Sequence, residues 1–222
     1  MPEHTVTSEI YEEFNYKTDT KPSKAGNVIS EFPFLLPKES SNCKFDKDDD
    51  LDIERPQKEV IKIEHSSKTK ISLVGLQVWR GAFLLGDLLI HLGHTGALSG
   101  KTVMELGAGT GISSFVAAIY AKKIICTVIY DDDVTAAFIS TVQKLLKTKP
   151  PKTLYMVLEK RYVFTIEHMD SVAPCYETFL TLLDKLKTDL TLEQLPLDFP
   201  KYFTYDRVKD LVLWKITSKQ KS

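Results

Sequence analysis

The sequence predicts an α/β fold with a mostly parallel sheet, because short apolar strands alternate with amphipathic helices along residues 57–217. Two of these strands, Lys101–Leu106 and Ile124–Tyr130, flank a predicted helix at Ile112–Lys122. A glycine-rich turn joins the first strand directly to that helix. This order places the turn at the carboxyl edge of the sheet, where α/β folds bind their ligands.

The remaining elements follow from hydrophobic periodicity. Val78–Leu92 predicts a helix, because Val78, Ala82, Leu85 and Leu89 fall on one face. We also expect early strands at residues 60–63 and 71–74, a second amphipathic helix at 134–147 and a further strand at 154–158. A long helix over 164–187, interrupted at Pro174, and a terminal antiparallel hairpin of 202–205 with 211–216 should follow.

Composition divides the chain into three parts. Residues 1–56 mix charged residues, Ser, Asn and Pro around short apolar islands such as Phe32–Leu36, which predicts a mostly disordered acidic tail. The island could dock on the domain, but a partly collapsed loop is the expectation. Residues 57–217 form the predicted domain, and residues 218–222 are a short C-terminal tail.

Charge and cysteine content exclude several classes of protein. The 222 residues carry a formal net charge of −1, so the overall charge does not indicate a nucleic-acid partner. The three cysteines are widely spaced and form no cluster with histidine, which argues against a metal site or a disulfide framework. The acidic start lacks a signal-peptide core, and we expect no membrane span. These features predict a protein of the nucleus or cytoplasm.

The segment that carries chemistry is Thr102–Ile112, in which Glu105 precedes three alternating glycines at Gly107, Gly109 and Gly111. Glycines let the backbone turn sharply and let a ligand lie against bare main chain. A dinucleotide fingerprint has the spacing G-x-G-x-x-G, but here the third glycine comes one residue early and Ile112 stands in its place. A tight turn that binds nothing is the structural alternative.

Glu105 restricts the class of ligand that the turn can bind. A carboxylate beside the turn disfavours a pyrophosphate and suits a ligand with an ammonium group and a positive sulfonium, which favours S-adenosylmethionine (AdoMet) over NAD. A nucleotide-binding oxidoreductase remains the alternative, and titration with NAD(H) would distinguish the two.

The motifs Val74–Leu85, with Trp79, and Val103–Gly111 together resemble family 16 of the seven-strand (class I) methyltransferases, which modify protein lysines. Further similar segments are Tyr130–Asp133, Val157–Arg161 and Leu211–Ile216. The resemblance implies a Rossmann-like methyltransferase sheet, AdoMet as cofactor and a protein substrate, with chaperone-type proteins among the candidates. We expect a monomer.

The resemblance also implies roles for individual residues. Trp79 would contact the cofactor, Gly107, Ala108, Gly109 and Gly111 would lie under its methionine part, and Glu105 would lie near its amino group. Tyr130 would border the channel for the substrate lysine, and on this basis it is the candidate catalytic residue.

The chain departs from the family pattern after Thr127. The family has an acidic residue there that binds the ribose, whereas this chain has Val128 and continues into Tyr130–Asp133. We infer an internal deletion at Thr127/Val128 that removes the segment from the second to the fourth strand and leaves the sheet incomplete. Such a chain could also be a catalytically impaired isoform, acting as a protein-binding module or as an unstable product.

Asp131 is an alternative candidate for the ribose-binding acid. It lies about 20 residues after the glycine turn, as the dinucleotide rule expects of a ribose-binding acid. The run Asp131–Asp133 also fits an N-cap and acidic first turn of the following helix. Both interpretations stay open on the sequence.

Overall fold

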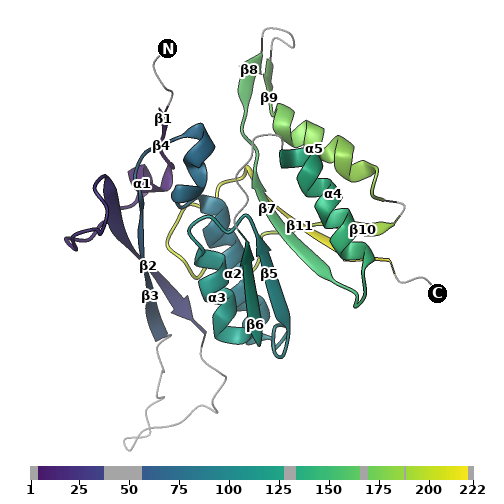
Figure 1. Ribbon diagram of the computed structural model, residues 1–222, viewed down its shortest axis with the longest axis horizontal. Helices are drawn as coiled ribbons and strands as arrows, with labels where there is room; N and C mark the ends of the chain where they lie inside the picture. The colour runs from purple at the N-terminus through teal and green to yellow at the C-terminus, as the bar shows by residue number, and fades with distance from the viewer. Residues whose placement is uncertain (1–4, 38–56, 128–133, 166–169, 188, 220–222) are drawn as a thin grey trace, which may run out of the picture. The chain divides into compact units, whose positions relative to one another are not determined.

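The protein is a mixed α/β structure in a computed structural model that describes residues 5–37, 57–127, 134–165, 170–187 and 189–219. It divides into two compact units, one of residues 1–130 and 199–206 and the other of residues 131–198 and 207–222 (Figure 1). Each unit is described by itself below.

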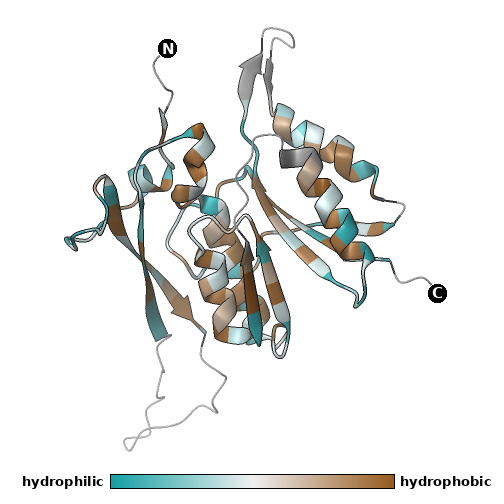
Figure 2. Ribbon diagram, viewed as in Figure 1, coloured by the Kyte–Doolittle hydropathy of each residue, from teal (hydrophilic) through white to brown (hydrophobic). Residues whose placement is uncertain are grey.

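The first unit contains the predicted strand, glycine turn and helix. β5 (Thr102–Leu106) pairs in parallel with β6 (Lys123–Thr127), and α3 (Ile112–Tyr120) connects them. α2 (Arg80–His94) packs against α3, so closely that a side chain at Gly93 would overlap the ring of Tyr120. Figure 2 shows β6 as a largely hydrophobic strand, in keeping with the apolar run from which it was predicted.

The expectation of a disordered tail over residues 1–56 is wrong for residues 5–37. They form β1 (Thr5–Val6), α1 (Ile10–Glu13) and β2 (Asn27–Leu36). β2 pairs antiparallel along its whole length with β3 (Gln57–Ser66), and residues 38–56 lie outside the described part of the chain. The apolar island Phe32–Leu36 is therefore part of a strand. Residues 5–37 are ordered because some of their apolar side chains are buried: Ile10, Phe32 and Phe34 are almost fully enclosed.

Aromatic rings hold this N-terminal segment to α2. Phe83 of α2 lies 5.4 Å from the ring of Phe32 and 6.0 Å from that of Tyr16. Phe34 stacks on Phe203 at 5.0 Å. Burying a large aromatic side chain stabilises a fold by roughly 1.5–3 kcal/mol, and several such rings outweigh the ordering of a polar segment.

Buried polar contacts fix the same segment at the start of α2. Gln77 is 1% exposed; its Oε1 accepts from the Ser8 amide at 2.8 Å, and its Nε2 donates to the Val6 carbonyl at 3.0 Å. Gln77 Nε2 also donates to Thr69 Oγ1 at 2.6 Å. Thr69 belongs to β4 (Thr69–Lys70), which pairs with β1. Arg80 forms an ion pair with Glu13. These contacts satisfy buried groups that would otherwise cost free energy.

The predicted strand at Ile71–Val74 is wrong, because residues Ile71–Leu76 form the 3-10 helix η1. A short apolar run does not distinguish a buried strand from a helical turn. Here the side chains of Ile71, Leu73 and Leu76 are exposed, so the run does not fill a core. By length and composition Ile71–His94 could cross a membrane, but half of its most apolar window is buried inside the protein, so this is weak evidence for a span.

The second unit is a three-stranded antiparallel sheet with two helices. The sheet order is β10 (Leu190–Leu195), β11 (Leu211–Ser218) and β7 (Thr153–Glu159). α4 (Val134–Lys147) and α5 (Pro174–Asp184) pack together beside it (Figure 1). Its buried core is Val142, Leu146, Met156, Phe179, Leu183, Leu213 and Ile216.

Two predictions for this unit are wrong. The helix expected over 164–187 begins only at Pro174, and a small hairpin of β8 (Val163–Thr165) and β9 (Asp170–Val172) precedes it. The proline explains the start, because it suits the first turn of a helix and not its interior. β11 pairs with β10 and β7, while Tyr202–Tyr205 forms no strand and contributes one bridge, from Phe203 to Phe34.

Residues 199–206 belong instead to the first unit, where Asp87 of α2 holds them. Asp87 is fully buried; its Oδ1 accepts from the amides of Tyr202 at 2.7 Å and Phe203 at 2.9 Å, and its Oδ2 accepts from the Tyr205 hydroxyl at 2.8 Å. A side chain at neighbouring Gly86 would lie 2.8 Å from the Phe203 ring. A buried carboxylate is tolerated here because hydrogen bonds replace its water.

Replacing Asp87 should therefore destabilise the first unit strongly. Asp87→Ala leaves three buried donors without an acceptor, and we expect the free energy of unfolding to fall by about 3 kcal/mol. Asp87→Asn, which keeps one acceptor oxygen, should fall between this variant and the parent. Urea titration measures the change, with exposed Asp19→Asn as the control. An Asp87→Ala variant as stable as Asp19→Asn would contradict the assignment.

His65 makes stability depend on pH. Burial lowers its pKa, and its Nε2 lies 2.7 Å from Ser30 Oγ while its ring stacks on Tyr11 at 4.8 Å. The folded state thus binds a proton less readily than the unfolded chain. The stability that His65 contributes is present when the pH lies above the ordinary histidine pKa of about 6.5. It is lost as the pH falls through and below that pKa.

We expect the urea midpoint to decline between about pH 6.5 and 5. His65→Gln should remove much of this decline, whereas exposed His94→Gln should leave it unchanged. An unaltered decline in His65→Gln would show that other groups cause it.

Candidate functional site

The glycine turn has the backbone geometry that its sequence predicts. After β5 ends at Leu106, Gly107, Gly109 and Gly111 take positive φ angles of 71°, 52° and 81°, and α3 begins at Ile112. Residues that carry a side chain rarely adopt positive φ angles, so glycine is needed at each position. The Gly111 amide donates to the carbonyl of Ala108 at 2.7 Å and closes the turn. The strand–turn–helix prediction is confirmed.

A second segment lies directly against this turn. A Cβ on Gly109 would stand 3.1 Å from the carbonyl oxygen of Gly75, so the two backbones touch. Gly75 belongs to η1, which leads through Gln77 to Trp79 at the start of α2. The segment with Trp79 and the glycine turn, separated by about 30 residues in the sequence, therefore meet in space.

Trp79 is half-buried, and its side chain is hydrogen-bonded to the loop that precedes it. Its indole Nε1–H donates to the carbonyl of Val74 at 2.9 Å. This bond fixes the loop that contains Gly75 and sets the orientation of the indole ring. The N–H group of Trp79 is thereby satisfied within the protein.

Glu105 supplies the negative charge of the site. Burial raises the pKa of its carboxyl, and hydrogen bonds from Ser114 and Ser113 at the start of α3 act in the opposite direction. The Ser114 hydroxyl donates to the Glu105 carboxylate. A half-buried carboxylate whose ionised form is penalised gains from a nearby cation, such as the ammonium group of an amino acid.

Sequence reasoning assigned no role to Gly75, Val74 or Ser114. Gly75 stands in a segment already singled out for Trp79, but only the fold shows that its carbonyl faces Gly109. Ser114 follows Glu105 by nine residues, across a turn, so no periodic pattern links them. Their contribution follows from tertiary contact.

The edge beside the turn is only partly described. β6 ends at Thr127, which is paired with Leu106 at the carboxyl end of β5. The next position in the chain is Val128, and Tyr130 and Asp131 follow it. All three lie outside the described residues, so the roles predicted for Tyr130 and Asp131 stay predictions.

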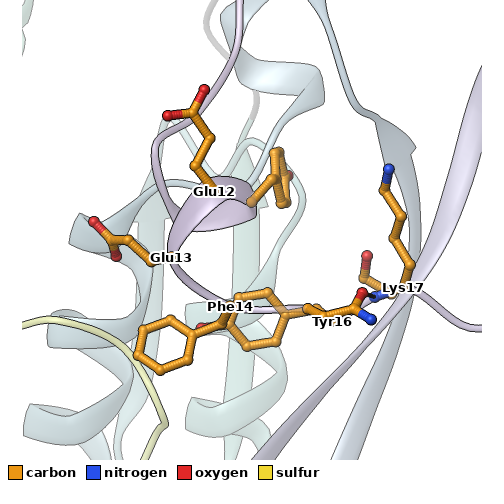
Figure 3. Close-up of a pocket in the computed structure, with 8 residues that line it drawn as sticks. Glu12, Glu13, Phe14, Tyr16 and Lys17 are labelled. Carbon is orange, nitrogen blue, oxygen red and sulfur yellow. Dashed lines mark hydrogen bonds between the residues drawn. The ribbon is translucent and has the colours of Figure 1, made fainter.

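A hollow of about 230 Å³ lies elsewhere in the first unit, between α1 and β2 (Figure 3). It is lined by Tyr11 to Lys17 and Ser30, and the Glu12 side chain points away from the rings of Phe14 and Tyr16. Glu13 is already bound to Arg80. This hollow shares no residue with the glycine turn, and the described residues include no group of His, Cys, Asp and Glu that could hold a metal ion.

The comparisons with known proteins identify the class. No family model matches the chain. It is, however, a homologue of methyltransferase-like proteins. The mouse methyltransferase-like protein 22 is 29% identical over an alignment that covers 71% of this chain and 59% of the mouse protein. Its human counterpart is 27% identical, with 71% and 57% covered. The chain thus spans less than two thirds of either relative.

A weaker match comes from a fungus. The protein N-terminal and lysine N-methyltransferase EFM7 of Gibberella zeae is 30% identical over 44% of this chain and 38% of that protein. The predicted resemblance to methyltransferases is confirmed by these relatives.

The alignment with the mouse protein also has an unusual length. It runs over 233 positions, more than the 222 residues of this chain, yet it covers only 71% of them, or about 158 residues. Roughly 75 of the 233 aligned positions therefore have no counterpart in this chain.

The close approach at Gly109 can be tested by substitution. Gly109→Ala combines an unfavourable φ with a contact of 3.1 Å to the Gly75 carbonyl, whereas Gly107→Ala meets nothing within 4 Å and bears the φ strain alone. We expect Gly107→Ala to lower the free energy of unfolding by about 1 kcal/mol. Gly109→Ala should cost more, because backbone must shift. Equal losses in urea titrations would show that the two segments do not touch.

Proposed function

We propose that this chain binds AdoMet at the glycine turn and belongs to the lineage of protein-lysine N-methyltransferases of family 16. The observation that carries the proposal is the turn itself. Three glycines of positive φ join β5 to α3, with the Glu105 carboxylate on one side and the Gly75–Trp79 segment against the other. The relatives from mouse, human and fungus support the same class of enzyme.

The residues present fit the methionine half of AdoMet. Gly107 and Gly109 offer bare backbone around Ala108, and α3, which begins at Ile112, offers its first amides after the turn. Glu105 would accept the ammonium group, which would relieve the penalty that burial places on its charge. The face of Trp79 would border the ligand from the other segment. When bound, AdoMet supplies an activated methyl group.

The substrate in this proposal is a lysine side chain of another protein. Methylation requires the amine to arrive deprotonated, desolvated and aligned with the methyl group, and it needs no catalytic triad. Tyr130 is the proposed channel residue. Chaperone-type proteins as substrates also belong to the proposal and rest on the family resemblance. A monomeric state belongs to it too, as does a place in the nucleus or cytoplasm, which rests on the cysteine content and the acidic start of the chain.

We further propose that the chain lacks an internal segment after Thr127. The alignment with the mouse protein supports this, because it leaves roughly 75 of its 233 positions without a counterpart here. The family resemblance implies a ribose-binding acid after Thr127, where this chain has Val128. In addition, β5 and β7 each have a single strand neighbour among the described residues, β6 and β11 respectively.

The loss of the acid would weaken AdoMet binding without abolishing it. A hydrogen bond to a charged group is worth about 1.5–3 kcal/mol. Its removal corresponds to roughly a tenfold to hundredfold loss of affinity. Asp131 could restore part of this if it reaches the ribose.

Calorimetry with AdoMet tests the proposal, on the chain as it stands and on a version that carries the corresponding segment of a relative between Thr127 and Val128. We expect weak binding by the chain and tighter binding after insertion, by roughly tenfold or more. Binding that the insertion does not improve would contradict the deletion, and would favour Asp131 as the ribose-binding group.

A matched pair of variants locates the ligand. Glu105→Gln should weaken AdoMet at least tenfold, because it removes the charge opposite the ammonium group. Glu12→Gln, at the hollow of Figure 3, should leave the affinity unchanged. If Glu12→Gln were the damaging variant, the ligand would lie in that hollow and not at the glycine turn.

A further inference from the structure

Lysines gather at one end of the second unit. Three segments meet there: the last turn of α4 with the loop that follows, the end of α5 with residues 185–187 and 189, and the end of β11 (Figure 1). Ser218 Oγ donates to the Leu146 carbonyl at 2.5 Å, and the Lys219 amide donates to the Asp189 carbonyl at 3.3 Å. We call this end the lysine surface; its lysines are Lys144, Lys147, Lys149, Lys152, Lys185, Lys187 and Lys219.

Positive charge exceeds negative charge on this surface. Its acidic residues are each already matched by a lysine: Lys147 to Asp189 at 2.7 Å and Lys187 to Asp184 at 2.5 Å. Lys144, Lys149 and Lys185 are exposed, and within the described part of the chain they have no ion pair. The excess is local, because the whole chain has a formal net charge of −1.

Helix ends explain only part of the cluster. Lysines in the last turn of a helix interact favourably with its dipole, which accounts for Lys144 and Lys147 on α4 and Lys185 after α5. The dipole gives no reason for Lys149 in the loop or for Lys219 after β11. Concentrated like charge raises the energy of the folded state and the potential at the surface, so it favours an anionic partner.

The lysine surface lies at the end of its sheet where β7 begins. β7 begins at Thr153, directly after Lys152, and ends at Glu159. Thr153 is paired with Thr217 of β11, two residues before Lys219.

The composition of the surface distinguishes between anionic partners. It contains lysine and no arginine, and its residues include no aromatic side chain on which a base could stack. We propose that the lysine surface docks an Asp/Glu-rich segment of a protein. The choice of a protein rests in part on the protein substrate of the proposed function.

Fluorescence anisotropy with a labelled poly-glutamate peptide tests this proposal on the full chain. The triple variant Lys144→Glu, Lys149→Glu, Lys185→Glu should bind roughly tenfold more weakly at low salt. The control variant Lys58→Glu, Lys68→Glu, Lys122→Glu changes the net charge equally with exposed lysines of the first unit, and it should bind within about twofold of the parent. Affinity of the parent should fall with added salt.

Several outcomes would overturn the proposal. Equal losses in the two triple variants would show a general charge effect. No binding of the peptide by the parent would exclude the docking surface. Tighter binding of a single-stranded oligonucleotide, lost in the same triple variant, would make this a nucleic-acid surface. AdoMet calorimetry on the triple variant separates the two proposals, because failure of the glycine turn to bind leaves the peptide result unaffected.

Discussion

The carbonyl oxygen of Gly75 occupies the space that a side chain on Gly109 would need, and the candidate site depends on this contact. It joins two segments that are distant in the sequence, one with Trp79 and one with the glycine turn. Buried polar groups hold the first of them in place, since Gln77 is bonded to the N-terminal residues Val6 and Ser8. The N-terminal segment thereby serves the site although it contributes no residue to it.

Local pattern was sufficient for the elements whose geometry is set by their own residues. The turn at Gly107–Gly111 was predictable because strand, glycines and helix follow one another directly. The order of residues 5–37 was not, because charged residues there conceal a few buried ones such as Ile10 and Phe32. The contact of Asp87 with residues 202–205 likewise joins positions more than a hundred residues apart, which no periodicity reveals.

Among the described residues, the strands β5 and β6 are not joined to the strands of the second unit in one sheet. They form a parallel pair, whereas β10, β11 and β7 form an antiparallel sheet of their own. Open strand edges are a liability for aggregation. In the first unit, Met104 of β5 and Phe115 and Ile119 of α3 are also exposed, which the proposed deletion would explain.

Hydrogen exchange measured by mass spectrometry, with and without millimolar AdoMet, tests the central claim most directly. We expect slower exchange in two peptides together, one spanning Val74–Trp79 and one spanning Val103–Ile112, because a ligand at the glycine turn contacts both. The lining of the hollow at residues 11–17 should be unchanged. Protection of that hollow alone, or of neither peptide at saturating AdoMet, would contradict the account.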